Sequence, residues 1–161
     1  MAQLHRELVI NAPPEAVFAL LAQPERLPEW TPGVIAVLIT SSGPVGVGTT
    51  TETVMEAFGV RQTLVGRCTI FEPSRRLVVS NETTGGIKVG SVTIGKVQST
   101  SSSELSPEGA GTRLRATLEY KLSAGMFSRL AEQLVGPKMK EDFEQSLTTL
   151  KRLLETAPPA G

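Results

Sequence analysis

The spacing of apolar and polar residues changes from a two-residue period to a helical period twice along the chain. Residues 4–11 alternate loosely and end before two prolines, which is typical of a first strand. Residues 11–24 then carry apolar side chains at helical spacing, and Asn11 is expected to cap this helix, which Pro24 ends. A second short helical segment is expected over residues 24–30.

The middle of the chain has the pattern of strands that are joined by short turns. Alternation predicts strands over residues 34–40, 49–57, 60–71, 77–84 and 112–122, and a polar strand that begins by Val97 after a glycine-rich loop. Hairpin-length connections favour an antiparallel sheet. The positions expected to face inward are Thr51, Thr53, Met55, Val60, Gln62, Leu64, Gly66, Cys68, Ile70, Leu114, Ala116, Leu118, Tyr120 and Leu122.

A helical period returns after residue 125 and continues to about residue 155. One apolar stripe is expected along it, formed by Phe127, Leu130, Leu134, Met139, Phe143, Leu147, Leu150 and Leu154. The pair Gly136-Pro137 is expected to interrupt and kink the helix. A sheet can bury its apolar face against one amphipathic helix if it curls around that helix, and a wide concave side leaves a cavity between them.

The pattern therefore predicts an α+β fold: a curved antiparallel sheet of six to seven strands, wrapped around a long C-terminal helix, with two short helices after the first strand. We expect one domain over residues 1–156 and a flexible tail over residues 157–161.

Composition narrows the functional classes. The 161 residues include 16 basic and 16 acidic ones, which argues against a nucleic-acid partner. One cysteine excludes an intrachain disulfide, and one histidine with one aspartate makes a zinc site or a Ser-His-Asp triad improbable. We therefore expect no metal and no cofactor. Since we find no signal peptide and no membrane span, we expect a soluble, cytoplasmic protein; its oligomeric state stays open, with a homodimer as one option.

Three segments in order carry a resemblance to a known superfamily: INAPPEAVFALLAQPERLPEWTPGV near the start, GAGTRLRATLEYKL before the last helix, and MKEDFEQSLTTLKRLLE at the end. The chain resembles the helix-grip (START-like, SRPBCC) superfamily, which includes the major birch pollen allergen and bacterial aromatase/cyclases. More narrowly, it resembles bacterial polyketide cyclase/dehydrase-like proteins. The segments span almost the whole chain, and no catalytic motif of a cyclase is found in it.

The resemblance implies that a small hydrophobic or amphipathic molecule, lipid-like or polyketide-like, binds between the sheet and the last helix. The residues expected to contact it are Trp30, Thr51, Thr53, Met55, Gln62, Leu64, Cys68, Leu118, Tyr120, Met126, Leu130 and Leu134. For each residue the alternative is an ordinary core position; Trp30, between two prolines, either lines the pocket mouth or plugs the end of the barrel. His5 is expected to be exposed.

Two other classes of function remain open at this point. The first is a polyketide cyclase or dehydratase, in which Tyr120 would act as a weak acid. The second is a co-chaperone-like interaction module, which would use the surface and have little cavity. Fold does not decide between these functions.

Overall fold

The protein is described here from a computed structural model, whose described residues are 2–86, 88–89, 92–93 and 95–156. The tail predicted over residues 157–161 lies outside them. In chain order the elements are β1 (Ala2–Ile10), α1 (Pro14–Leu21), η1 (Pro24–Glu29), β2 (Val34–Ile39), β3 (Thr50–Ala57), β4 (Val60–Glu72), β5 (Arg76–Thr83), β6 (Lys88–Val89), β7 (Val92–Thr93), β8 (Lys96–Glu108), β9 (Gly111–Ser123), η2 (Gly125–Phe127) and α2 (Ser128–Thr156).

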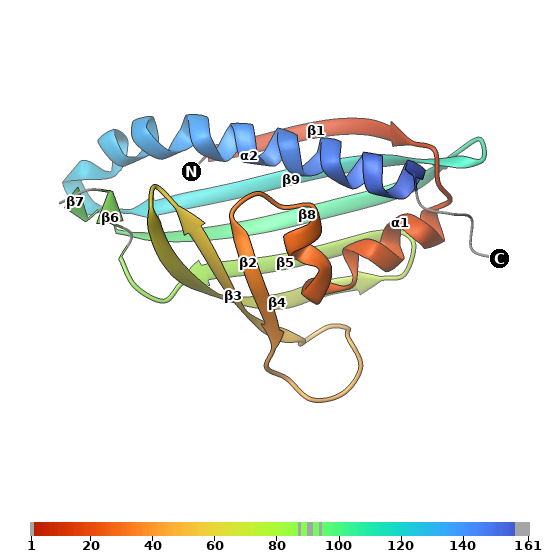
Figure 1. Ribbon diagram of the computed structural model, residues 1–161, viewed down its shortest axis with the longest axis horizontal. Helices are drawn as coiled ribbons and strands as arrows, with labels where there is room; N and C mark the ends of the chain where they lie inside the picture. Colours follow the sequence, from red (N-terminus) through yellow and green to blue (C-terminus); the bar gives the residue numbers. More distant parts are fainter. Residues whose placement is uncertain (1, 87, 90–91, 94, 157–161) are drawn as a thin grey trace.

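Seven strands form one antiparallel sheet, in the order β1-β9-β8-β5-β4-β3-β2, and β6 pairs with β7 separately. The sheet bends strongly, so that β2 and β3 cross in front of the long strands β8 and β9, while α2 runs along β1 and β9 (Figure 1). The predicted α+β helix-grip architecture is confirmed. The glycine-rich segment before Val97 forms the short β6–β7 pair within its described residues.

One local expectation about the helices is wrong. Asn11 does not cap α1: the helix begins at Pro14 with Pro13 as its N-cap, and Pro13 has no side chain that could bond the free amides. The backbone N–H of Asn11 instead donates to Glu155 Oε2 at 2.8 Å, which joins the start of the chain to the end of α2. α2 continues through Pro137 as one helix, so the pair Gly136-Pro137 does not divide it, and the kink expected there stays a prediction.

A β-bulge in β4 changes which side chains reach the core. Cys68 pairs with Val79, but Ile70 pairs with Val78, so one extra residue lies between them on β4. The alternation shifts by one position, so Phe71 rather than Ile70 packs into the core. The ring of Phe71 lies edge-on to that of Phe18, and their centroids are 5.1 Å apart. The inward orientation predicted for Ile70 is therefore wrong, because alternation predicts a face only while the register is regular.

The register of α2 against the sheet also differs from the predicted stripe. The buried face carries Ala131, Val135, Leu147 and Leu150, with Met139, Phe143 and Leu154 packed beside it. Leu130 and Leu134 lie one residue earlier, which turns them about 100° away around a helix of 3.6 residues per turn. The second half of the predicted stripe is confirmed and the first half is wrong.

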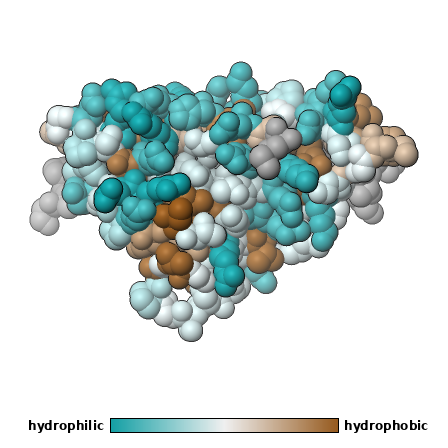
Figure 2. Space-filling model, turned by 180° about the vertical axis from the view of Figure 1, so that it is seen from behind, coloured by the Kyte–Doolittle hydropathy of each residue, from teal (hydrophilic) through white to brown (hydrophobic). Residues whose placement is uncertain are grey.

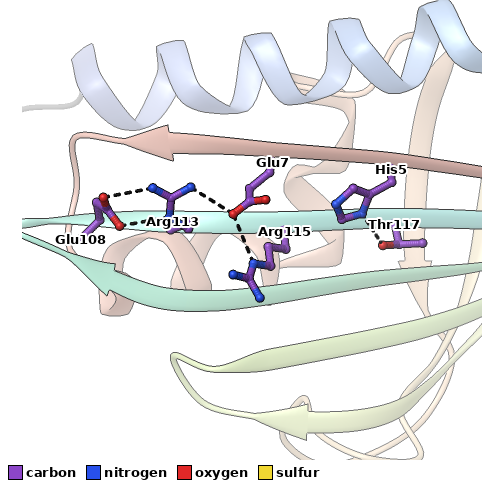
Figure 3. Close-up of polar contacts among 6 residues, drawn as sticks. All are labelled: His5, Glu7, Glu108, Arg113, Arg115 and Thr117. Atoms are coloured by element: carbon purple, nitrogen blue, oxygen red, sulfur yellow. Dashed lines mark hydrogen bonds and ion pairs between the residues drawn. The ribbon is translucent and has the colours of Figure 1, made fainter.

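The outer face of the sheet is polar over β1, β9 and β8. Arg113 donates to Glu108 and to Glu7 at 3.0 Å each, and Arg115 donates to the same Glu7 oxygen at 3.2 Å (Figure 3). His5 lies beside this network, 3.1 Å from the hydroxyl of Thr117, and it is exposed as expected. This face therefore has paired charges.

The molecular surface seen from behind is mostly hydrophilic, and hydrophobic residues gather there in small separate groups (Figure 2). Among the described residues, no helix combines the length and the apolar character that crossing a membrane requires.

Candidate functional site

A cavity of about 310 Å³ lies between the concave face of the sheet and α2. This volume is at the lower end of the range of roughly 300–1,000 Å³ that is common for small-molecule sites. A second cavity of about 160 Å³ adjoins it, and the two share walls formed by Leu27, Trp30, Asn81 and Ser101. Phe58, at the β3–β4 turn, lines the larger cavity and is 39% exposed, so this end faces solvent.

Six of the predicted ligand contacts line the larger cavity. They come from the loop after η1 and from strands β3, β4 and β9, and they are Trp30, Thr53, Met55, Gln62, Leu64 and Leu118. Two more, Thr51 and Cys68, line the adjoining cavity and are buried. Burial raises the pKa of the Cys68 thiol, so this cysteine is kept neutral and is a poor nucleophile.

Tyr120 is buried but does not line either of these cavities. It belongs to a separate core cluster with Val97, Leu122, Ala131 and Val135. Its hydroxyl faces Gly136 of α2, where a Cβ atom would lie 3.4 Å away. Burial, with a smaller contribution from the charge of Glu132, raises the pKa of Tyr120. The bend of the sheet turns this end of β9 under α2, and Tyr120 instead borders an open hollow of about 530 Å³. Its predicted ligand contact and weak-acid role stay predictions.

The predicted contacts on α2 and η2 are wrong. Met126 is 90% exposed, and Leu130 and Leu134 are 53% and 47% exposed, on the side of the helix that faces away from the sheet. The residues of α2 that face the cavity are instead Val135, Lys138, Met139, Asp142, Phe143, Ser146 and Leu147. Sequence periodicity could not separate these two faces, since both carry apolar side chains at helical spacing.

The loop that holds Trp30 has two buried polar atoms without partners. Neither Trp30 Nε1 nor Thr31 Oγ1 has a hydrogen-bond partner among residues 2–86, 88–89, 92–93 and 95–156. Both residues line the larger cavity, where Trp30 forms part of the apolar wall with Leu21 and Leu27. Trp30 therefore lines a cavity and also packs against the core. Its position agrees in part with both alternatives from the sequence, a residue of the pocket wall and a residue of the core.

An ion pair on α2 faces the cavity and was not predicted. Lys138 Nζ donates to Asp142 Oδ1 at 2.9 Å, one helical turn away. The hydrogen bond to Asp142 raises the pKa of Lys138, so its ammonium stays charged. The Asp142 side chain is less exposed than that of Lys138. The available signal was that Asp142 is the sole aspartate of the chain.

Polar side chains from β5 and β8 also line the cavity and were missed. They are Asn81, Thr83, Ser99, Ser101 and Ser103. The serine-rich run was interpreted as the polar end of a long strand, whereas alternate serines of that run face inward. The spacing of Ser99, Ser101 and Ser103 was the signal that could have found them, because positions two apart share one face of a strand.

Two hollows on the outside of the sheet are weaker candidates. One of about 530 Å³ lies over Arg67, Glu82 and Lys121, and one of about 400 Å³ lies over Glu7, Glu104 and Arg115. Both are open to solvent and are lined mainly by charged or polar residue types, so neither encloses a ligand as the inner cavity does. Within the described residues, no three His, Cys, Asp or Glu side chains gather as a metal site would require.

Comparison with known proteins places this geometry in context. The family described as "Polyketide cyclase / dehydrase and lipid transport" matches residues 1–155. None of the curated proteins matches the chain. Among solved structures, the protein TTHA0849 of Thermus thermophilus is 24% identical, with a TM-score of 0.74 and coverage of 95% of this chain and 97% of that one.

Two further structures are similar. CV1439 of Chromobacterium violaceum is 21% identical, with a TM-score of 0.66 and coverage of 96% and 98%. Ara h 8.0201 is 14% identical, with a TM-score of 0.67 and coverage of 97% and 99%. At these identities the similarities show that the fold is shared.

Proposed function

This chain belongs to the polyketide cyclase/dehydrase and lipid transport family, and on that premise we propose that it binds a small amphipathic molecule in the cavity between the sheet and α2. The cavity itself is the observation that supports the proposal. Burial of apolar ligand surface against Trp30, Met55 and Leu118 would supply most of the affinity, at about 25 cal/mol per Å² before the costs of association.

The first test is native mass spectrometry of the purified protein, compared with its denatured mass. We expect a reproducible additional mass under native conditions, or binding of added small molecules that changes the fluorescence of Trp30, the only tryptophan.

A pair of variants makes the test specific to the cavity. Ser101→Phe places a ring in the cavity, whereas Thr100→Phe places the same ring on the outer face of the same strand. We expect S101F to lose binding and T100F to keep it. A bare native mass, together with no response to fatty acids, aromatic compounds or polyketide mimics, would contradict the proposal and favour an interaction module.

A cyclase or dehydratase is the second candidate, and the Lys138–Asp142 pair favours it. In an aldol closure, the Asp142 carboxylate would take a proton from carbon next to a ketone, and that carbon would bond to a second carbonyl carbon. The resulting alkoxide would take that proton back from Asp142. In the dehydration, Asp142 would remove a second proton from the same carbon and pass it to the departing hydroxyl group, which leaves as water while the carbon–carbon double bond forms. We expect Asp142→Asn to abolish turnover of a poly-β-ketone and to keep its binding; equal turnover would contradict this role.

A further inference from the structure

The inner face of β8 carries hydroxyl groups where a core-facing strand usually carries aliphatic ones. Ser99, Ser101 and Ser103 follow one another at two-residue spacing, and all three line the larger cavity. Ser101 is exposed although it faces inward, since the cavity leaves free space in front of it. β-branched and aromatic residues are enriched in strands, so three inward serines are a costly choice for stability alone.

The polar surface continues across the sheet. Ser99 pairs with Asn81 on β5, Asn81 pairs with Gly66 on β4, and Gly66 pairs with Thr51 on β3. Because Gly66 has no side chain, the Asn81 carboxamide and the Thr51 hydroxyl extend over it. Thr53 lies two residues further along β3. We call this set the hydroxyl floor: Thr51, Thr53, Asn81, Ser99, Ser101 and Ser103.

Within the part of the chain that the structure describes, the side chains of the hydroxyl floor have no hydrogen-bond partner. Thr83 beside them accepts a hydrogen bond from the backbone N–H of Val97 at 3.1 Å. Among the described residues, no side chain of the hydroxyl floor makes such a bond, and none has a fully enclosed polar atom, so each borders open cavity space. A polar group removed from water without a partner is destabilising. An occupant that covers this floor must therefore supply hydrogen-bonding atoms.

The wall of the cavity opposite the hydroxyl floor is apolar. Val135, Met139, Phe143 and Leu147 of α2 face the cavity with apolar surface, and Trp30 closes one side. The cavity thus has one wall rich in hydrogen-bonding groups and one apolar wall. A saturated acyl chain would match the apolar wall and leave the hydroxyl floor unpaired.

We infer that the cavity selects a ring compound with hydroxyl or carbonyl oxygens along one edge, which the hydroxyl floor binds, in preference to an acyl chain. This inference rests on the proposed function and names the class of ligand. Such a compound presents its ring face to the apolar wall and its oxygens to the floor. Sites that hydrogen-bond a ligand hydroxyl reject analogues without it strongly, since their own polar groups are then left unpaired.

Calorimetric titration with three probes tests the inference. The probes are a dihydroxynaphthalene with both hydroxyls on one ring, naphthalene, and palmitate. We expect the diol to bind about tenfold more tightly than naphthalene, although its hydrophobic driving force is smaller. The reason is that each net hydrogen bond raises the binding affinity roughly threefold to tenfold. Palmitate should bind more weakly than the diol.

Matched variants on β8 locate the effect. The variant S101A/S103A removes two inward hydroxyls, and T100A/S102A removes two hydroxyls from the outer face of the same strand. We expect the first to weaken diol binding by roughly tenfold or more and to leave naphthalene unchanged, and the second to change neither. If the double variant does not fold, the single variants S101A and S103A carry the same comparison.

The outcomes separate the two proposals. Tighter binding of palmitate than of the diol, or equal losses in the inward and outward variants, would overturn the inference while ligand binding stands. No heat from any probe, with a bare native mass, would contradict the proposed function and the inference with it.

Discussion

Gly66 on β4 and Asn81 on β5 are cross-strand partners, and the Asn81 carboxamide occupies the space in front of the glycine. A Cβ atom at position 66 would lie 2.5 Å from Asn81 Oδ1 and 2.6 Å from Thr51 Oγ1. Both distances are far below a van der Waals contact. Position 66 therefore admits no side chain unless the polar groups of the cavity floor move.

Gly66→Ala is expected to destabilise the protein by about 1–3 kcal/mol, the usual cost of overpacking. Urea unfolding followed by Trp30 fluorescence measures this change. Gly85→Ala is the matched control, because a Cβ atom there meets no atom of the described residues within 4 Å. Equal midpoints for the two variants would show that the contact at Gly66 relaxes at no cost.

Truncation of neighbouring residues on α2 is expected to have unequal effects. Val135→Ala removes two buried methyl groups and should cost roughly 1–2 kcal/mol, at about 0.8 kcal/mol per buried group. Leu134→Ala removes more atoms but from an exposed side chain, and it should change stability by less than about 0.5 kcal/mol. The melting temperatures of both variants measure the difference. A larger loss of stability for L134A than for V135A would place the buried face of α2 one residue earlier.

Cys68 is expected to react slowly with iodoacetamide in the native protein. Burial raises the pKa of its thiol, which lowers the thiolate fraction, and the side chain is 6% exposed. Mass spectrometry after timed labelling at pH 8 should show slow modification without urea and fast modification in urea. Equal rates in the two conditions would mean that β4 opens readily.

The outer charge network should contribute stability that acid removes. Hydrogen bonds from Arg113, with Arg115 also bonding Glu7, hold the pKa values of Glu7 and Glu108 below those of free glutamates. Since these pKa values are depressed on folding, the contribution is present above the unfolded pKa and is lost as pH falls through the folded one.

Arg113→Met should therefore lower the melting temperature slightly at pH 7 and reduce its fall between pH 5 and pH 3. A series of melting temperatures across this range measures the effect. The residues are partly exposed, so the difference should shrink as salt is added. Parallel curves for the variant and the native chain would show that the network adds nothing.

The local pattern of apolar and polar residues was sufficient to predict most helices and strands and part of the candidate site. The strict alternation of β9 predicted its buried residues, because a strand with one face on the core repeats every two residues. The same rule placed Thr53, Gln62 and Leu64 on the inner face, where they line the cavity. It failed at Ile70, where the bulge adds a residue that no sequence signal announced.

What the sequence determined by itself is the order of elements, the curved antiparallel sheet and the long final helix, because these follow from local periodicity and turn chemistry. Only the tertiary structure decided which inward residues meet open space. Tyr120 and Ser99 are paired inward positions on adjacent strands, yet α2 covers Tyr120 while Ser99 borders the cavity. That difference arises from the bend of the sheet and the rotation of α2 about its axis, which are set by packing between residues far apart in the chain.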